Sequence, residues 1–227
     1  MILTDLPLEI TAEDVIRAQG LSVDRVKSKS PRLIEITHRA VEEGLPYLQP
    51  RVAFERYPVT GITSTGVLLG ESITLEGDLL RQHFENCQEI AAAVCTVGEK
   101  IGVLVSELFP KDVALAMALE ALASAATEIL GNSLCNYIDN TVRQDGLFTI
   151  LPINPGMTGW PVEVGQPQVF SLVDTSGIGV TLDDSGLMRP LKSLSMIIGI
   201  SKTKSMHQKS CDLCNLQKNC PYKPDSE

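Results

Sequence analysis

The stretch FTILPINPGMTGWPVEVGQPQVFSLVDTSGIGVTLDDSGLMRPLKSLSMIIGI, residues 148–200, says more about the fold than any other part of the chain. Its first residues, Phe148–Asn154, alternate between apolar and polar side chains, which is typical of a strand. The following Pro155-Gly156 pair marks a turn. Further along, Pro167–Val173 predicts one or two helical turns, so the stretch mixes strand and helix in a short length.

The second half of the stretch predicts a hairpin and a final strand. Residues Ile178–Leu182 and Leu187–Met188 flank the sequence DDSG, a plausible hairpin turn. The last segment, Ser193–Ile200, places serines on one face and larger apolar residues on the other, as a strand with a period of two does.

The chain before residue 148 alternates between blocks of helix and blocks of strand. Thr11 and Asp14 have the spacing of a capping box at a helix start. The expected elements are helices over about Ala12–Leu21 and Pro31–Leu45, two or three strands within Tyr47–Tyr57 and Gly61–Leu75, a helix over Leu79–Asn86, a buried strand over Ile90–Thr96, and helices over Glu99–Leu108 and Asp112–Asp145. This order predicts an α+β fold.

The composition is that of a soluble globular protein. The net charge of -9 disfavours nucleic acid and anionic membranes as partners, and it suits a partner with a basic rim. The N-terminus lacks the basic and apolar regions of a secretory signal. No run reaches the roughly 18 apolar residues of a membrane span. We therefore expect a cytoplasmic protein without a membrane segment.

Residues 155–199 resemble the activation (reactivation) domain of vitamin B12-dependent methionine synthase, and more closely the short stand-alone proteins related to it. Family members show a Pro-Gly-Tyr turn, Trp-Pro, a Gln and a Leu-Phe helix, then Ile-Gly-Val, Met-x-Pro and Lys-Ser-Val-Ser-Gly. The matching positions here are Pro155, Gly156, Trp160, Pro161, Gln166, Phe170, Ile178, Gly179, Val180, Ser185, Met188, Pro190, Lys192, Ser193, Ser195 and Gly199. The helix EALASAATEILGN (120–132) also resembles the one upstream of that turn.

The resemblance implies a fold and a function. The family fold is a twisted antiparallel sheet flanked by helices, in agreement with the α+β prediction. In the full-length enzyme this domain binds S-adenosylmethionine, faces the cobalamin and supports reductive methylation of cob(II)alamin. The implied partner is a corrinoid-binding protein or a cobalamin-dependent methionine synthase, with the cobalamin carried by that partner. The implied process is methionine biosynthesis.

The resemblance also implies which residues bind cofactor, although it assigns no catalytic residue. Glu128 corresponds to a ligand-contacting glutamate of the family, and a solvated helix charge is the alternative. Hydroxyl groups near the end of the stretch are candidates for corrinoid amides, with strand packing and turn formation as alternatives. The full candidate set is Glu128, Pro155, Gly156, Met157, Trp160, Ser185, Lys192, Ser193 and Ser195.

Two positions depart from the family pattern. The family has an arginine three residues before the Pro-Gly and a tyrosine after it, whereas this chain has Pro152 and Met157. A guanidinium binds a carboxylate with two hydrogen bonds, and proline has no side-chain donor. These two positions therefore allow a second interpretation of the function. In this interpretation the chain is a non-enzymatic corrinoid-protein-binding or electron-relay module that does not bind S-adenosylmethionine.

The C-terminal tail is a candidate metal site. We expect an activation-like domain over residues 1–200, followed over 201–227 by a polar linker and a Cys-rich tail. Cys211, Cys214 and Cys220 lie within ten residues, and Pro221 follows them. This spacing favours a [4Fe–4S] cluster with a fourth ligand from elsewhere, zinc completed by His207, or reactive thiols without metal. The fourth cluster ligand could be Cys87, Cys95 or Cys135, an external ligand or a thiol of a partner.

Overall fold

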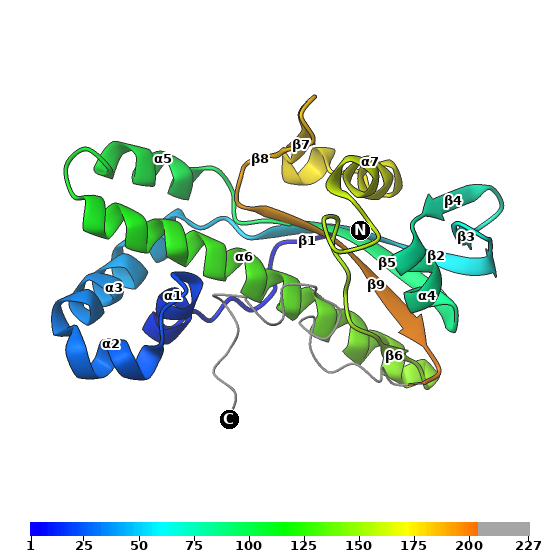
Figure 1. The fold of residues 1–227 in the computed structure, drawn as a ribbon, viewed down its shortest axis with the longest axis horizontal. Coiled ribbons are helices and arrows are strands. Elements are labelled where there is room, and N and C mark those ends of the chain that lie inside the picture. Colours follow the sequence, from blue (N-terminus) through cyan, green and yellow to red (C-terminus); the bar gives the residue numbers. More distant parts are fainter. Residues whose placement is uncertain (204–227) are drawn as a thin grey trace.

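The computed structural model describes residues 1–203 of the chain. Figure 1 shows a central antiparallel sheet with helices on both sides. The helices are α1 (Ala12–Ala18), α2 (Val23–Lys29), α3 (Pro31–Gly44), α4 (Asp78–Phe84), α5 (Lys100–Leu108), α6 (Val113–Val142) and α7 (Val162–Leu172). The strands are β1 (Ile2–Leu3), β2 (Arg51–Ile62), β3 (Gly66–Leu69), β4 (Ile73–Glu76), β5 (Cys87–Thr96), β6 (Phe148–Thr149), β7 (Thr181–Leu182), β8 (Met188–Arg189) and β9 (Ser193–Ser201).

The main sheet has the strand order β4-β3-β2-β5-β9-β6, and β1 pairs with β2. Every pairing in it is antiparallel. The strands β7 and β8 form a separate hairpin. The predicted α+β fold with an antiparallel sheet flanked by helices is therefore confirmed, and so is the hairpin around DDSG. The division at residue 200 stays a prediction, because most of the tail, including Cys211, Cys214 and Cys220, lies outside the described residues.

The strands β5 and β9 pair over nearly their whole length and are buried on both faces. On one face Ala91, Ala93 and Met196 pack against α6, together with α1, α3 and α5. On the other face Ala92 and Ile197 pack against α7, α4 and the β3–β4 hairpin. Strands covered on both sides have apolar side chains at successive positions, which explains the continuous apolar run that begins at residue 90.

The long helix α6 approaches β9 closely because a glycine faces the strand. A Cβ atom added at Gly131 would lie 2.8 Å from Met196 Cε and 2.9 Å from a Leu194 methyl group. By length and composition Val113–Asp145 could cross a membrane, but 61% of its most apolar window is buried inside the molecule. Such burial is expected of the core helix of a soluble protein.

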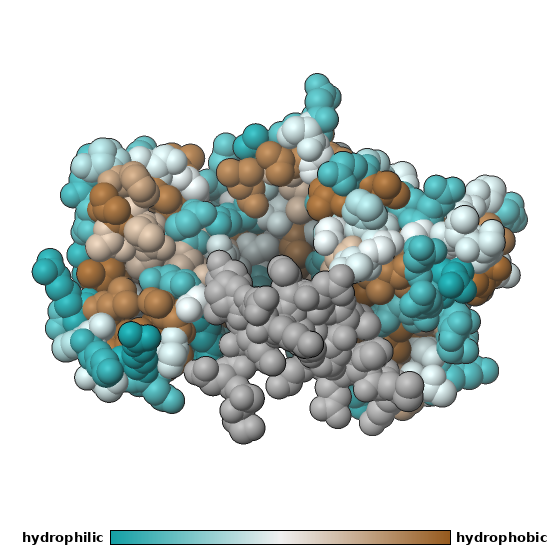
Figure 2. All heavy atoms as spheres, viewed as in Figure 1, coloured by the Kyte–Doolittle hydropathy of each residue, from teal (hydrophilic) through white to brown (hydrophobic). Residues whose placement is uncertain are grey.

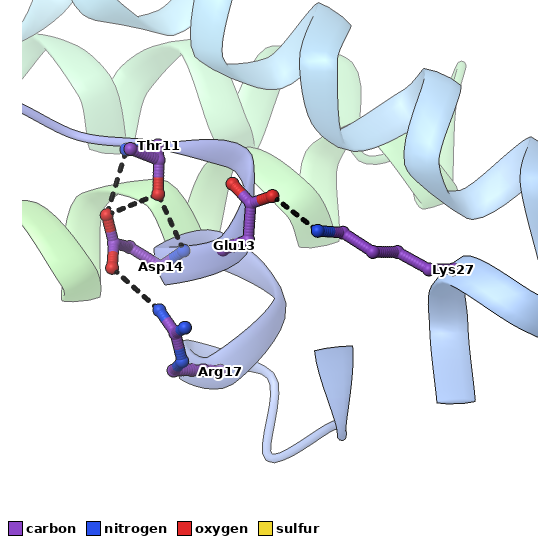
Figure 3. A network of polar contacts seen from close by, with 5 residues as sticks. All are labelled: Thr11, Glu13, Asp14, Arg17 and Lys27. Atoms are coloured by element: carbon purple, nitrogen blue, oxygen red, sulfur yellow. Dashed lines mark hydrogen bonds and ion pairs between the residues drawn. The ribbon is translucent and has the colours of Figure 1, made fainter. Parts of the chain in front are cut away.

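The helix α1 begins with the capping box that the sequence predicted, and an ion pair joins it to α2 (Figure 3). The Thr11 amide donates to the Asp14 carboxylate at 2.9 Å, and the Asp14 amide donates to the Thr11 hydroxyl at 3.3 Å. Arg17 pairs with the same carboxylate from the next turn. Lys27 of α2 pairs with Glu13 of α1 at 2.9 Å. The helix α2 was not predicted, because its seven residues are mostly polar.

Two expectations in residues 148–173 were wrong in extent. The strand expected over Phe148–Asn154 is regular only in β6, although Ile153 still pairs with Ile197 of β9. The helix expected over Pro167–Val173 begins five residues earlier, at Val162. Pro167 therefore lies inside α7 rather than at its start, a position that proline usually avoids.

The only tryptophan of the chain fixes α7 to the rest of the fold. Trp160 is fully buried, and its indole N–H donates to Gln168 of α7 at 3.0 Å. A Cβ atom added at Gly165 would lie 2.8 Å from the Trp160 ring and 2.9 Å from Pro155. A Cβ atom at Gly77 would meet the same ring at 3.0 Å. The ring thus occupies the space between α7 and the start of α4.

We expect Gly165→Ala to destabilise the protein by about 1–3 kcal/mol, because the added methyl group overpacks the contact with Trp160. The matched control is Gly102→Ala in α5, where an added Cβ has no neighbour within 4 Å. The control should gain up to about 1 kcal/mol from the higher helix propensity of alanine. Urea denaturation of both variants measures the difference, and equal effects of the two substitutions would contradict the packing described here.

Candidate functional site

The Pro-Gly turn is present and closed by backbone hydrogen bonds. The Gly156 amide donates to the Trp160 carbonyl at 2.8 Å, and the Trp160 amide donates to the Met157 carbonyl at 2.9 Å. Gly156 and Gly159 both have positive φ angles, 98° and 86°, which favour glycine over any other residue. The turn predicted at Pro155-Gly156 is present, and it depends on Gly156 and Gly159.

The turn lies against the open edge of β9. On the side away from β5, β9 is paired in the described part of the chain only near its C-terminal end, by β6 and Ile153. Beside its N-terminal half, the Asn154 side-chain amide donates to the Ser195 carbonyl at 2.9 Å. The backbone of that half of β9 is thus bordered by a turn rather than by another strand.

The predicted hydroxyl residues of β9 are engaged inside the fold. The Ser195 hydroxyl is buried and donates to the Gln166 side chain of α7 at 2.9 Å. The Ser193 hydroxyl donates to the Pro190 carbonyl at 2.7 Å. Ser185 is exposed, and its hydroxyl donates to Asp183 at 2.6 Å within the hairpin turn. Strand packing and turn formation account for these three contacts, and their ligand role stays a prediction.

The candidates divide between the two faces of the sheet. Lys192 extends toward α6, where its ammonium group donates to Ser124 at 2.9 Å and pairs with Glu120. Glu128 is exposed one helical turn after Ser124, so it lies on the same stripe of α6. Trp160 and Ser195 instead face α7. The open edge of β9 separates the two groups, and any ligand that contacts both has to span this edge.

The two departures from the family pattern border this edge as well. Met157 is half-buried against the core beneath α7, and its sulfur lies 3.4 Å from the Asn154 amide, which donates to it. Pro152 is half-buried and offers no donor. Within residues 1–203 the turn itself therefore carries no cationic side chain.

A polar pocket lies further along the same edge, where α6 meets β6. Its volume is about 260 Å³, and it is lined by Cys135, Asn136, Asp139, Arg143, Phe148 and Thr149. The helix runs beside β9, so that Ser124 reaches Lys192 at one end and Asp139 reaches Thr149 at the other. The sequence analysis missed this pocket, and its one local signal was the spacing of Asp139 and Arg143, four residues apart on one helix face.

Asp139 is an acidic group of the pocket that accepts hydrogen bonds from Thr149 and Arg143. Its Oδ1 accepts hydrogen bonds from the Thr149 amide at 3.0 Å and the Thr149 hydroxyl at 3.1 Å, and its Oδ2 accepts one from Arg143 Nε at 2.6 Å. Burial acts to raise the pKa of Asp139, but the hydrogen bonds from Thr149 and Arg143 outweigh it and hold this pKa below its usual value. Asp139 is therefore a carboxylate at neutral pH.

The described cysteines are protonated thiols. Burial raises the pKa of Cys87 and of Cys135 to about 12, and burial also raises the pKa of Cys95. Metals bind the thiolate, which burial disfavours. No cluster of three metal-binding side chains occurs within residues 1–203. Cys95 is a core thiol, whereas Cys135 is half-buried and lines the pocket.

The sequence matches no protein-family model and no curated protein. Among solved structures, the chain is similar to the MetH reactivation domain bound to AdoHcy. The TM-score is 0.64, the match covers 94% of this chain and 82% of that one, and the sequence identity is 13%. At this identity the likeness establishes the fold, and it agrees with the resemblance found over residues 155–199.

We expect Asp139→Asn to destabilise the protein by about 1 kcal/mol at neutral pH, because the hydrogen bonds to a charged acceptor are weakened. The folded-state pKa is lowered, so the stabilisation is present above the ordinary value of 3.8 and is lost as the pH falls through the folded-state pKa. The stability difference between wild type and variant should therefore shrink below pH 3.8. Urea denaturation across this range measures it. Asp184→Asn in the exposed DDSG turn is the control for loss of one charge, and the same pH-dependent loss there would refute the assignment.

Proposed function

We propose that the chain is a reactivation protein for a cobalamin-dependent methyltransferase of the methionine synthase type. The observation that carries the proposal is the likeness to the MetH reactivation domain over nearly the whole chain. The ordered sequence matches over residues 155–199 supply independent support. The corrinoid belongs to the partner, either a corrinoid-binding protein or the synthase, and this chain presents the surface that faces it.

The proposed reaction has two steps. The partner's cob(II)alamin takes one electron from a low-potential reductant and becomes cob(I)alamin. The cobalt of cob(I)alamin then forms a bond to the methyl carbon of S-adenosylmethionine as the carbon–sulfur bond breaks, which leaves S-adenosylhomocysteine and methylcobalamin. The neighbour was solved with AdoHcy, which is the product of this transfer.

The geometry supports this reading in part. The closed Pro-Gly turn and the open edge of β9 form a platform on which a ligand could lie. Pro152 supplies no donor for a carboxylate, and the sulfur of Met157 already accepts a hydrogen bond. A ligand at this edge would therefore need its charged partners from outside the turn.

A second candidate function follows from the same two residues. Without a cationic group at the turn, the chain could act as a corrinoid-protein-binding or electron-relay module that does not bind S-adenosylmethionine. The three tail cysteines, Cys211, Cys214 and Cys220, would then hold the redox centre, since iron–sulfur clusters are bound by thiolates. In that case the protein passes an electron to the partner and takes no part in methyl transfer.

The surface offers a place for a protein partner. Four apolar side chains on α5, directly after it and at the start of α6 are about half exposed, namely Val103, Phe109, Val113 and Met117. Figure 2 shows apolar surface over this part of the molecule. Contiguous apolar surface of this kind marks protein contacts. The net charge of -9 complements a partner with a basic rim in the cytoplasm.

Incubation of the protein with cob(II)alamin-loaded partner, a low-potential one-electron reductant and S-adenosylmethionine should produce methylcobalamin. The spectral change from cob(II)alamin to methylcobalamin under anaerobic conditions measures it. Faster reduction to cob(I)alamin without S-adenosylmethionine, and no gain in methylcobalamin with it, would favour the electron-relay function. No effect of the protein in either arm would refute both functions.

Anaerobic purification of the full chain should yield iron and acid-labile sulfide, with absorbance near 400 nm, if the tail holds an iron–sulfur cluster. The control is a triple variant, Cys211→Ala, Cys214→Ala and Cys220→Ala, which should lose the metal and keep the fold. Zinc without sulfide would instead support a structural metal site. A variant that keeps the full metal content would place the site elsewhere.

A further inference from the structure

Arg143 is held in place from two sides. Its Nε donates to Asp139 at 2.6 Å, and its guanidinium carbon lies 5.8 Å from the centroid of the Phe148 ring. A charge-assisted hydrogen bond and a cation–π contact together restrict both the position and the plane of the group. In the described part of the chain no other hydrogen bond or ion pair of this guanidinium occurs, so its two terminal nitrogens are available.

The terminal edge of a guanidinium suits a carboxylate, because its two parallel N–H groups match the two oxygens. Beside it, Asp139 Oδ2 accepts only the Arg143 bond within residues 1–203, so it has room for a further donor such as an ammonium group. The pocket thus presents a cation and an anion next to each other. This arrangement complements an α-amino carboxylate, and it disfavours a simple anion such as phosphate.

The volume of the pocket limits what it can hold. Pockets for whole drug-sized ligands run from about 300 to 1,000 Å³, whereas this one measures about 260 Å³. It accommodates an amino-acid-sized group and leaves a larger body outside. Between the pocket and the Pro-Gly turn β9 is bordered by β6 and Ile153, so such a body would have to pass over this segment to reach the turn.

We propose that the Asp139–Arg143 pocket binds the α-amino carboxylate end of an adenosyl amino acid, with Arg143 as the residue that selects ligands carrying the carboxylate. The inference rests on the proposed function for the identity of the ligand. It assigns the carboxylate contact to the C-terminal end of α6, outside the Pro-Gly turn.

The test compares two ligands that differ in this group. S-adenosylhomocysteine carries the α-amino carboxylate, and 5′-methylthioadenosine keeps the nucleoside and the thioether but lacks it. Calorimetry with the full chain should give at least about tenfold tighter binding of S-adenosylhomocysteine, as a charge-assisted bidentate contact predicts. Arg143→Gln should remove this preference and leave 5′-methylthioadenosine binding unchanged, and Arg143→Lys should restore part of it.

The matched control is Arg189→Gln. Arg189 also pairs with an aspartate through its Nε, at 3.3 Å, and its side chain is as exposed as that of Arg143, at 54%. This control should keep the ligand preference of the wild type, and thermal melts should show that all variants fold. Equal affinities for both ligands, no binding of either, no effect of Arg143→Gln, or an equal loss in Arg189→Gln would each overturn the proposal.

The binding test contains no cobalamin, so its outcome is separate from that of the methylation assay. Binding that depends on Arg143 without methyl transfer would leave the pocket standing and refute the proposed reaction. Methyl transfer that persists in Arg143→Gln, with unchanged ligand preference, would support the reaction and refute the pocket.

Discussion

The structure depends on the burial of the β5–β9 pair from both sides. Helices can approach both faces of an antiparallel pair only if the facing side chains are small or well matched, because protein interiors are close-packed. This chain meets the requirement with alanines on both faces of β5 and a glycine in α6 opposite β9. The helix α6 and the helix α7 are thereby fixed on opposite sides of one strand pair.

The packing of α6 and α7 on opposite sides of β5 and β9 also creates the candidate site. The strand β9 lies beside β5 on one side, and on the other it is bordered by β6, Ile153 and the Pro-Gly turn. Both helices pack against β9, yet its first half is not paired with a strand on this side in residues 1–203. Polar groups of the turn therefore border the unpaired half of β9, and polar groups of α6 and β6 lie at its other end.

The sequence predicted those elements for which the hydrophobic period and the length of the segment indicate the same structure. The apolar run at Ile90–Thr96 and the long helix ending near Asp145 are found almost as expected. The prediction of element boundaries failed near two prolines. The strand from Phe148 is interrupted near Pro152, which cannot donate to a ladder. The helix α7 continues through Pro167, and the next residue, Gln168, accepts a hydrogen bond from the buried Trp160.

The site was harder to predict than the fold. The Pro-Gly turn could be identified because it is local in sequence. The pocket combines α6 with β6, and Asp139 and Thr149, which are ten residues apart, become neighbours only after the chain reverses. The position of Trp160 has one more consequence. It is the chain's only tryptophan and is buried between α4, α7 and the turn. Its intrinsic fluorescence therefore reports on the conformation of the turn without any added label.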